Sequence, residues 1–290
     1  MSRVAALVEL MRPRQWPKNG FVLAGLVFGH GWEEPARVAA AIAATAAFCL
    51  GSGAVYAFND CRDLARDRRH PRKRARPLAR GAVSVRAAYA LAAAAAAAGL
   101  ALAAWAGPAA AACLAAYLAL NVAYTLRLKT VPVLDVFAIA AGFMLRLLAG
   151  TAGIGIEPSK WLLACGFLLT LFLAFAKRRA ELAQLGAEAG AHRAVLAAYS
   201  AAFLDRATFA CAMATAAAYL LYTLDAETTA RHGTDDLVLT LPWVMLGLFR
   251  YLYRLHFRGA GGDPAEELVT DPVLALAVAG WFGTVLWLIG

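Results

Sequence analysis

Nine apolar runs, each close to the length that crosses a lipid bilayer, constrain this chain more than any other feature of its sequence. They cover residues 19–32, 36–58, 87–106, 108–126, 131–152, 158–176, 203–224, 237–257 and 270–289. A membrane-spanning helix needs about 20 predominantly apolar residues, and the runs lack the alternating polarity of a transmembrane β-barrel. Hydrophobic residues make up 62% of the 290 residues and charged residues only 16%. The pattern predicts an all-α, polytopic membrane bundle of about nine transmembrane helices, and it excludes a soluble enzyme and a disulfide-stapled secreted module.

Basic residues gather on one side of the membrane if all nine runs cross it. Of the 28 Lys and Arg residues, 24 then lie on one side, three lie on the other, and Arg146 lies within a run. The positive-inside rule assigns the larger group to the cytoplasm. Without the short run at 19–32, the basic N-terminus would lie opposite the basic loop at 59–86, so the charges support counting that run. We therefore expect a multi-pass protein of the plasma membrane with a cytoplasmic N-terminus.

The predicted organisation is a single domain, residues 1–290, whose polar motifs all lie on the cytoplasmic side. Residues 1–18 are expected to begin with an amphipathic helix on the membrane surface, because Val4, Leu7 and Val8 recur at helical spacing. The loops expected to form the active site are 59–86, 127–135 and 177–206.

An acidic cluster follows the second run. Asp60, Asp63 and Asp67 share one face if the helix continues past residue 58, because successive residues turn by about 100°. Three like charges on one stripe repel each other, whereas Mg²⁺ prefers one or two carboxylates together with substrate phosphates. The cluster therefore suggests a magnesium–diphosphate site. The alternative is a solvated helix whose aspartates pair with neighbouring arginines such as Arg62 and Arg66.

The same segment resembles the first aspartate-rich motif, NDxxDxxxD, of the UbiA superfamily of membrane prenyltransferases. Asn59, Asp60, Asp63 and Asp67 match that motif letter for letter, and residues 76–81 resemble its RP-x-x-x-G continuation. The resemblance implies a bundle of nine transmembrane helices with an active site open to the cytoplasm. It also implies that the three aspartates are the catalytic, Mg²⁺-binding residues.

Five further tracts resemble one branch of this superfamily, whose members transfer 5-phosphoribosyl from phosphoribosyl pyrophosphate (PRPP) to decaprenyl or another polyprenyl phosphate. The tracts are 11–19, 70–77, 124–135, 142–150 and 177–182, and after about residue 200 the resemblance is much less specific. It implies PRPP and a polyprenyl phosphate lipid as substrates, Mg²⁺ as cofactor, and a product on the route to decaprenylphosphoryl arabinose for cell-wall arabinan. No nucleic-acid partner is expected, and a homo-oligomer is possible.

The tract KRRAEL, residues 177–182, favours this branch over one that uses prenyl diphosphates. Prenyl-diphosphate enzymes of the superfamily carry a second DxxxD motif here, whereas this chain has Lys177 and Glu181 at the two aspartate positions. A patch of Lys177, Arg178 and Arg179 suits direct contact with phosphate oxygens. The alternative is an ordinary basic boundary after an apolar run.

Further polar residues lie near the fourth and fifth runs. Lys129 and Asp135 are expected either to pair with each other or to hold a ribose hydroxyl and a phosphate, and Arg146 either closes an internal ion pair or reaches the site, with the structural role favoured. The complete set of predicted substrate-binding residues is Lys18, Asn59, Arg74, Arg76, Tyr124, Arg127, Lys129, Asp135, Lys177, Arg178, Arg179 and Glu181.

Two other functions remain open from the sequence. One is transfer of an isoprenyl group from a prenyl diphosphate to an aromatic acceptor, as in quinone biosynthesis. The other is a non-catalytic membrane transporter or scaffold, which the scarcity of polar residues within the runs disfavours, because a transport path needs polar groups near the midplane.

Overall fold

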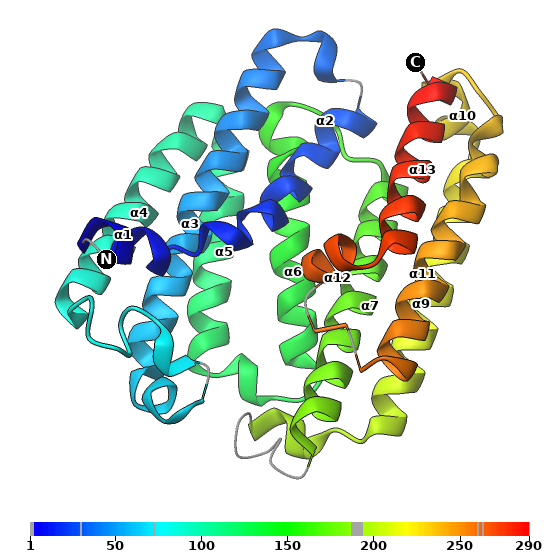
Figure 1. Cartoon of the computed structure of the whole chain (residues 1–290). Coiled ribbons are helices and arrows are strands. Elements are labelled where there is room, and N and C mark those ends of the chain that lie inside the picture. Colours follow the sequence, from blue (N-terminus) through cyan, green and yellow to red (C-terminus); the bar gives the residue numbers. More distant parts are fainter. Residues whose placement is uncertain are drawn as a thin grey trace. The chain divides into compact units, whose positions relative to one another are not determined.

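A computed structural model describes residues 3–29, 31–71, 73–186, 194–259, 261–262 and 264–289 (Figure 1). All regular structure in those ranges is helical, which confirms the predicted all-α class. Eight helical segments there are long and apolar enough to cross a membrane. The chain is therefore a multi-pass membrane protein. The eight segments contain α3 (Pro35–Arg69), α4 (Val85–Ala106), α5 (Pro108–Leu126), α6 (Leu134–Ala149), α7 (Lys160–Leu185), α9 (Ala201–Leu224), α11 (Leu241–Phe257) and α13 (Pro272–Ile289).

Shorter helices join these segments. The α-helical ones are α1 (Arg3–Leu10), α2 (Ala24–Phe28), α10 (Ala226–His232) and α12 (Pro264–Thr270). The 3-10 helices are η1 (Pro13–Leu23), η2 (Gly31–Glu33), η3 (Lys73–Ala75), η4 (Leu128–Thr130), η5 (Ala152–Ile154), η7 (Ala194–Ala198) and η8 (Asp236–Thr240). In α1, Val4 and Val8 are exposed whereas Leu10 is buried. The amphipathic character of this helix and its place on the membrane surface stay predictions.

The predicted first span, residues 19–32, is not confirmed as a long helix, because η1 and α2 divide this region. Pro17 removes a backbone donor inside η1, which disfavours a continuous α-helix. The region nevertheless runs antiparallel to α3, since Arg12 contacts Asp60 and Asn19 contacts Ser52. The stretch of α3 between Pro35 and Asp60 is about 37 Å long at 1.5 Å per residue. Residues 12–34 thus extend along a length of α3 that exceeds the hydrocarbon thickness of about 30 Å, whereas the predicted span begins at Asn19, opposite Ser52, and covers only about 26 Å of it.

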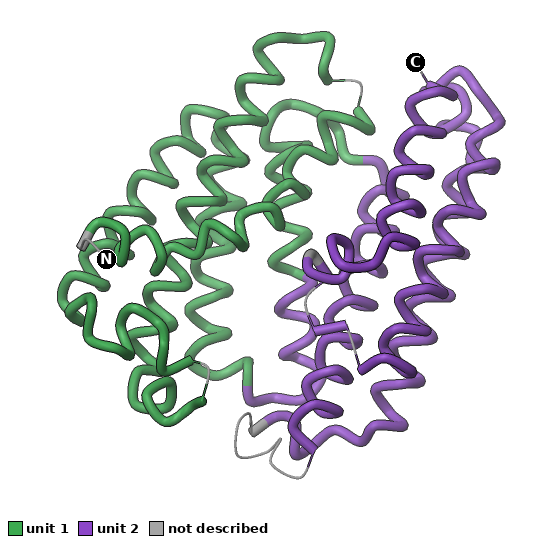
Figure 2. Tube along the Cα trace, viewed as in Figure 1, with its two compact units in different colours: residues 1–129, 141–158 green, residues 130–140, 159–290 purple. Residues whose placement is uncertain are grey.

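The chain divides into two compact units (Figure 2). Unit 1 comprises Met1–Lys129 and Ala141–Pro158, and unit 2 comprises Thr130–Ala140 and Ser159–Gly290, so the boundary falls twice in or beside α6. In unit 1, α3 packs against α4, α5 and η1, and the core includes Phe48, Leu114 and Tyr117.

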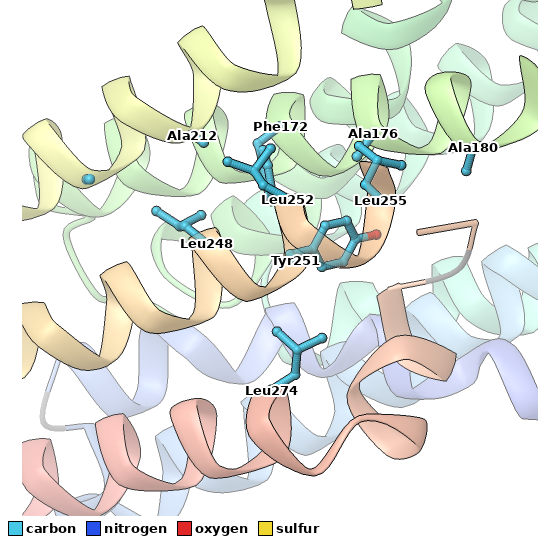
Figure 3. Close-up of a cluster of buried hydrophobic side chains, with 10 residues drawn as sticks. Phe172, Ala176, Ala180, Ala212, Leu248, Tyr251, Leu252, Leu255 and Leu274 are labelled. Carbon is cyan, nitrogen blue, oxygen red and sulfur yellow. The ribbon is translucent and has the colours of Figure 1, made fainter. Parts of the chain in front are cut away.

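In unit 2, α7 packs against α9, and α11 packs against α9 and α13. One of its cores, shown in Figure 3, brings Phe172 of α7 against the ring of Tyr251 of α11, with Leu274 of α13 in the same cluster. Apolar side chains on facing helices therefore build each unit around its own interior.

Two glycines allow a close backbone approach within unit 1. A Cβ atom added at Gly150 would collide with the carbonyl oxygen of Val22, and one added at Gly25 would collide with the carbonyl oxygen of Gly150. The η1–α2 segment thus lies against the end of α6 with no room for a side chain. Only glycine permits this contact without a backbone shift.

We expect Gly150→Ala to destabilise the protein by about 1–3 kcal/mol, the usual cost of forcing extra atoms into a packed interior. Thermal unfolding of the detergent-solubilised protein measures the loss. Gly20→Ala is the matched control, because a Cβ atom at Gly20 would meet no atom within 4 Å. Equal unfolding temperatures for the two variants would contradict the close approach.

Candidate active site

The three aspartates of the acidic motif lie on α3, which continues to Arg69 as a helix and so extends well into the predicted 59–86 loop. Asp60 and Asp67 are each 3% exposed, and Asp63 is half-buried. A buried carboxylate is costly unless it is paired or hydrogen-bonded. The surroundings of Asp60 and Asp67 must therefore supply positive charge.

That positive charge comes from three separate segments of unit 1. Arg76 Nη1 donates to Asp60 Oδ1 at 3.1 Å and to Asp67 Oδ2 at 2.7 Å, and Arg12 also donates to Asp60 Oδ1. Lys129 Nζ donates to both carboxylate oxygens of Asp63, at 3.1 and 3.3 Å. Of the neighbouring arginines, Arg66 lies 3.7 Å from Asp63. The motif is thus enclosed by cations from distant segments, unlike the locally paired, solvated helix considered above.

The three aspartates are the candidate ligands for Mg²⁺, and two of them share one cation in this structure. A single nitrogen, Arg76 Nη1, lies within 3.1 Å of both Asp60 and Asp67, so both carboxylates already converge on one positive group. Within the described residues, no group of three His, Cys, Asp or Glu side chains is arranged to hold a metal. Mg²⁺ often takes only one or two carboxylates and completes its shell with substrate phosphates and water. The donor set therefore suits a magnesium–diphosphate complex, and the ligand roles of all three aspartates stay predictions.

Asn59 also joins this cluster, because its side-chain oxygen accepts a hydrogen bond from the buried Thr125 hydroxyl near the end of α5. The structure therefore brings together Asn59, Arg76 and Lys129 with the aspartates, as the sequence predicts. For the four other predicted substrate-binding residues of unit 1, Lys18 donates to Gln15 at 2.5 Å, Arg74 and Arg127 are exposed, and Tyr124 is half-buried. Their binding role stays a prediction.

A second charged cluster lies inside unit 2. Arg178 of α7 and Asp135 of α6 are both fully buried, and Arg178 Nε donates to Asp135 Oδ2 at 2.6 Å. Arg178 Nη1 donates to Glu181 Oε2 at 2.7 Å, and the Tyr199 hydroxyl donates to Asp135 Oδ1 at 2.7 Å. Every charge in this cluster has a hydrogen-bonded partner of opposite sign.

The predicted pair of Lys129 with Asp135 is wrong. Lys129 binds Asp63, whereas Asp135 binds Arg178. Asp135 lies in the first turn of α6 beside the buried Val136, so its charge is enclosed in unit 2 and needs a cation there.

Within the predicted phosphate-binding patch of Lys177, Arg178 and Arg179, Arg178 is buried in an ion pair with Asp135, and its role as a phosphate donor stays a prediction. All three residues belong to α7, which continues to Leu185, and consecutive residues of a helix point in different directions. Arg179 Nε donates to Asp205 Oδ1 at 2.7 Å. The binding roles of Lys177, Arg179 and Glu181 stay predictions, and residues 187–193 of the predicted 177–206 loop lie outside the described residues.

Arg146 has the structural role that the sequence favours. Its Nε donates to Asn19 Oδ1 at 2.8 Å, its Nη2 donates to the Tyr117 hydroxyl at 3.0 Å, and its Nη1 donates to the Gly142 carbonyl at 2.8 Å. The guanidinium also lies 4.5 Å from the centre of the Tyr117 ring. Arg146 thus joins α5, α6 and η1 through polar contacts instead of the ion pair that the sequence left open.

Arg12, Thr125 and Tyr199 belong to these clusters but are not among the predicted site residues. Arg12 belongs to a tract that the sequence singled out, and its two prolines and three basic residues were the available signal. Tyr199 had no signal, because it lies 64 residues from Asp135 in an ordinary segment. Burial, together with the hydrogen bond to Asp135, raises the pKa of Tyr199 to about 12, so its hydroxyl stays protonated and donates.

A family model described as the UbiA prenyltransferase family matches residues 20–193. The chain belongs to this family. Two similar relatives are decaprenyl-phosphate phosphoribosyltransferases. The one from Mycolicibacterium smegmatis is 35% identical, over 97% of this chain and 92% of its own length. The one from Corynebacterium glutamicum is 35% identical, over 95% of this chain and 84% of its own length.

Solved structures of the UbiA family share the fold. A UbiA homolog from Archaeoglobus fulgidus, bound to GPP and Mg²⁺, aligns with a TM-score of 0.74 at 21% identity, over 97% of this chain and 99% of that one. The apo structure of a UbiA homolog from Aeropyrum pernix aligns with a TM-score of 0.62 at 19% identity, over 97% and 98%. These likenesses confirm the UbiA-like architecture that the sequence predicts.

Proposed function

We propose that this protein transfers a 5-phosphoribosyl group from PRPP to a polyprenyl phosphate, with release of diphosphate, at the cytoplasmic face of the plasma membrane. The observation that carries the proposal is the 35% identity, over nearly the whole chain, to decaprenyl-phosphate phosphoribosyltransferases. Lys177 and Glu181, which replace the two aspartates of a second DxxxD motif, support the same branch. The product would then serve as a precursor for cell-wall arabinan.

The aspartate cluster suits this reaction. Bond cleavage at C1 of the ribose leaves negative charge on the departing diphosphate. Mg²⁺ bound there would act as a Lewis acid toward that charge. Asp60 and Asp67 would hold the ion, and the homolog of known structure that binds GPP and Mg²⁺ supports a metal in this family.

Arg12, Arg76 and Lys129 would serve as direct donors to the phosphate oxygens once the substrate complex replaces them at the carboxylates. Each already carries a charge-assisted hydrogen bond to an aspartate, so each lies within reach of a ligand bound there.

The acceptor needs little activation. A polyprenyl phosphate is already an anion at neutral pH, so a strong general base is unnecessary, and the main task of the protein is to hold the two substrates in reactive orientation. The isoprenoid tail would lie in the membrane.

A labelling experiment tests the proposal. Membranes containing the protein are incubated with PRPP labelled in the ribose, decaprenyl phosphate and Mg²⁺, and the organic phase is analysed. We expect a labelled, acid-labile lipid whose formation requires all three components and stops when EDTA removes the metal.

A parallel incubation with geranyl diphosphate and 4-hydroxybenzoate tests the alternative of aromatic prenyl transfer. A prenylated acid in that incubation, with no labelled lipid in the first, would reject phosphoribosyl transfer in favour of prenyl transfer. The absence of both products would reject both reactions.

A further inference from the structure

Two non-glycine residues of the described chain have a left-handed backbone, and both adjoin the charged clusters. Arg12 has φ 52° and Val133 has φ 68°. Left-handed backbone is costly for residues with a Cβ atom, and for a β-branched residue such as valine it is a genuine outlier. Such strain persists only where the surroundings enforce it, and it tends to occur at functional sites. Arg12 holds Asp60, so its strain has an evident purpose.

Val133 lies in the turn between α5 and α6, four residues after Lys129. Its carbonyl accepts hydrogen bonds from the N–H groups of Val136 and Phe137, both at 3.0 Å, and so begins α6. Its own N–H donates to the Tyr199 hydroxyl at 2.6 Å. The strained residue is therefore fixed on both sides, by a helix start at its carbonyl and by one tyrosine at its N–H.

Tyr199 is itself held rigidly. It is 7% exposed, it stacks on Phe203 with a 5.9 Å distance between ring centroids, and its hydroxyl donates to Asp135. Asp135 is in turn fixed by the buried Arg178. The hydroxyl has one hydrogen to give and gives it to Asp135, so its lone pair is directed to the N–H of Val133. The chain of contacts runs from α7 through Asp135 and Tyr199 to the turn.

We propose that Tyr199 is a positioning residue that holds the turn at Val133 and thereby the backbone that leads to Lys129, four residues earlier in the chain. Without the hydroxyl, the strained turn can relax to ordinary backbone angles, and Lys129 is only four residues away along the chain. A displacement of about 1 Å near a reacting centre can cost about 100-fold in rate. The inference rests on the proposed function, because Lys129 is placed there as a donor to the phosphates of PRPP.

The test is Tyr199→Phe, with Tyr222→Phe as the matched control. Tyr222 lies at the far end of α9, where its hydroxyl bonds His232 Nε2 at 3.1 Å, so the control also removes one hydrogen-bonded hydroxyl from unit 2. We expect Tyr199→Phe to lower kcat/KM for PRPP by about tenfold or more, through KM for PRPP, with KM for polyprenyl phosphate unchanged. Tyr222→Phe should stay within about twofold of wild type.

A rescue variant separates positioning from a general loss of stability. Val133→Gly removes the steric cost of the left-handed backbone, so it should restore most of the lost kcat/KM when combined with Tyr199→Phe. If Tyr199 only stabilised the fold, Val133→Gly would not restore the kcat/KM lost in Tyr199→Phe. A kcat/KM equal to that of Tyr222→Phe, or a loss that Val133→Gly leaves unchanged, would overturn the proposal.

Hydrogen exchange tests the same contact without any activity. The amide of Val133 should exchange faster in Tyr199→Phe than in wild type, with no change in Tyr222→Phe. If wild-type protein forms no phosphoribosyl lipid, the proposed function fails while this exchange difference still decides whether Tyr199 holds the turn. Equal exchange in all three proteins would overturn the placement itself.

Discussion

Asp60→Asn is expected to abolish phosphoribosyl transfer almost completely, with a loss of about 4 kcal/mol in transition-state stabilisation, or roughly a thousandfold in kcat. Asp60 is buried and faces both Arg12 and Arg76. The neutral amide of the variant is a weaker ligand for Mg²⁺. It also lacks the negative charge that holds the guanidinium groups of Arg12 and Arg76. Both the metal and the phosphate donors of the site would therefore be misplaced.

Two measurements check this expectation. Initial rates with labelled PRPP give the loss of turnover. The thermal shift produced by Mg²⁺ together with inorganic diphosphate reports binding directly, since a ligand that binds only the folded protein raises its unfolding temperature. The wild type should show that shift, and Asp60→Asn should lose most of it.

Glu9→Gln is the matched control for Asp60→Asn. Glu9 also pairs with an arginine of unit 1, Arg80, at 2.8 Å, but both side chains are at least 35% exposed. An exposed ion pair contributes only about 0–1 kcal/mol, so the control should keep its activity and its thermal shift. Near-normal turnover in Asp60→Asn would reduce the aspartate cluster to a set of structural ion pairs.

The sequence predicts the helices well because bilayer-length apolar runs have few other interpretations. It does not predict the break within residues 19–32, where η1 ends at Leu23, α2 begins at Ala24, and the backbone of Gly25 lies close to that of Gly150. Hydropathy measures how apolar a run is and contains no information about backbone packing. Hydropathy therefore finds this apolar segment but does not predict that its helix is broken.

The sequence predicts that Arg76 and Lys129 gather at the aspartates, but it does not predict how the charges of Lys129 and Asp135 pair. Helical spacing alone places Asp60 and Asp67 on one face. The partners of Lys129 and Asp135 depend instead on which unit encloses each side chain, and the two residues are only six apart. Their proximity in the sequence suggests that they pair, but Asp135 lies in the first turn of α6 and binds Arg178 of unit 2. The run of three basic residues, 177–179, likewise gives no sign that Arg178 is buried.

Arg178→Met is expected to destabilise the protein by about 3–5 kcal/mol, because it leaves the fully buried Asp135 without its cation. The Tyr199 hydroxyl, which also bonds Asp135, cannot neutralise that charge. For a chain of this size the change corresponds to a fall of roughly 10 °C in unfolding temperature. Thermal unfolding and the yield of folded protein in detergent measure it.

Arg231→Gln is the control for a pair that water already solvates. Arg231 bonds Glu227 at 3.2 Å on α10, with both side chains at least 34% exposed, so its loss should cost about 0–1 kcal/mol. The double variant Asp135→Asn, Arg178→Met removes both charges of the buried pair and keeps an acceptor for Tyr199. It should therefore recover much of the stability that Arg178→Met loses.

The same variants decide between the two interpretations of the basic tract. If Arg178 bound substrate phosphate, Arg178→Met would raise KM for PRPP or polyprenyl phosphate and leave the unfolding temperature unchanged, and the double variant would be no more stable than the single one. If Arg178 instead neutralises Asp135, Arg178→Met lowers the unfolding temperature, and the added Asp135→Asn change restores much of it. A buried ion pair is unlike a phosphate site in this respect: removal of one charge harms the fold, and removal of both repairs it.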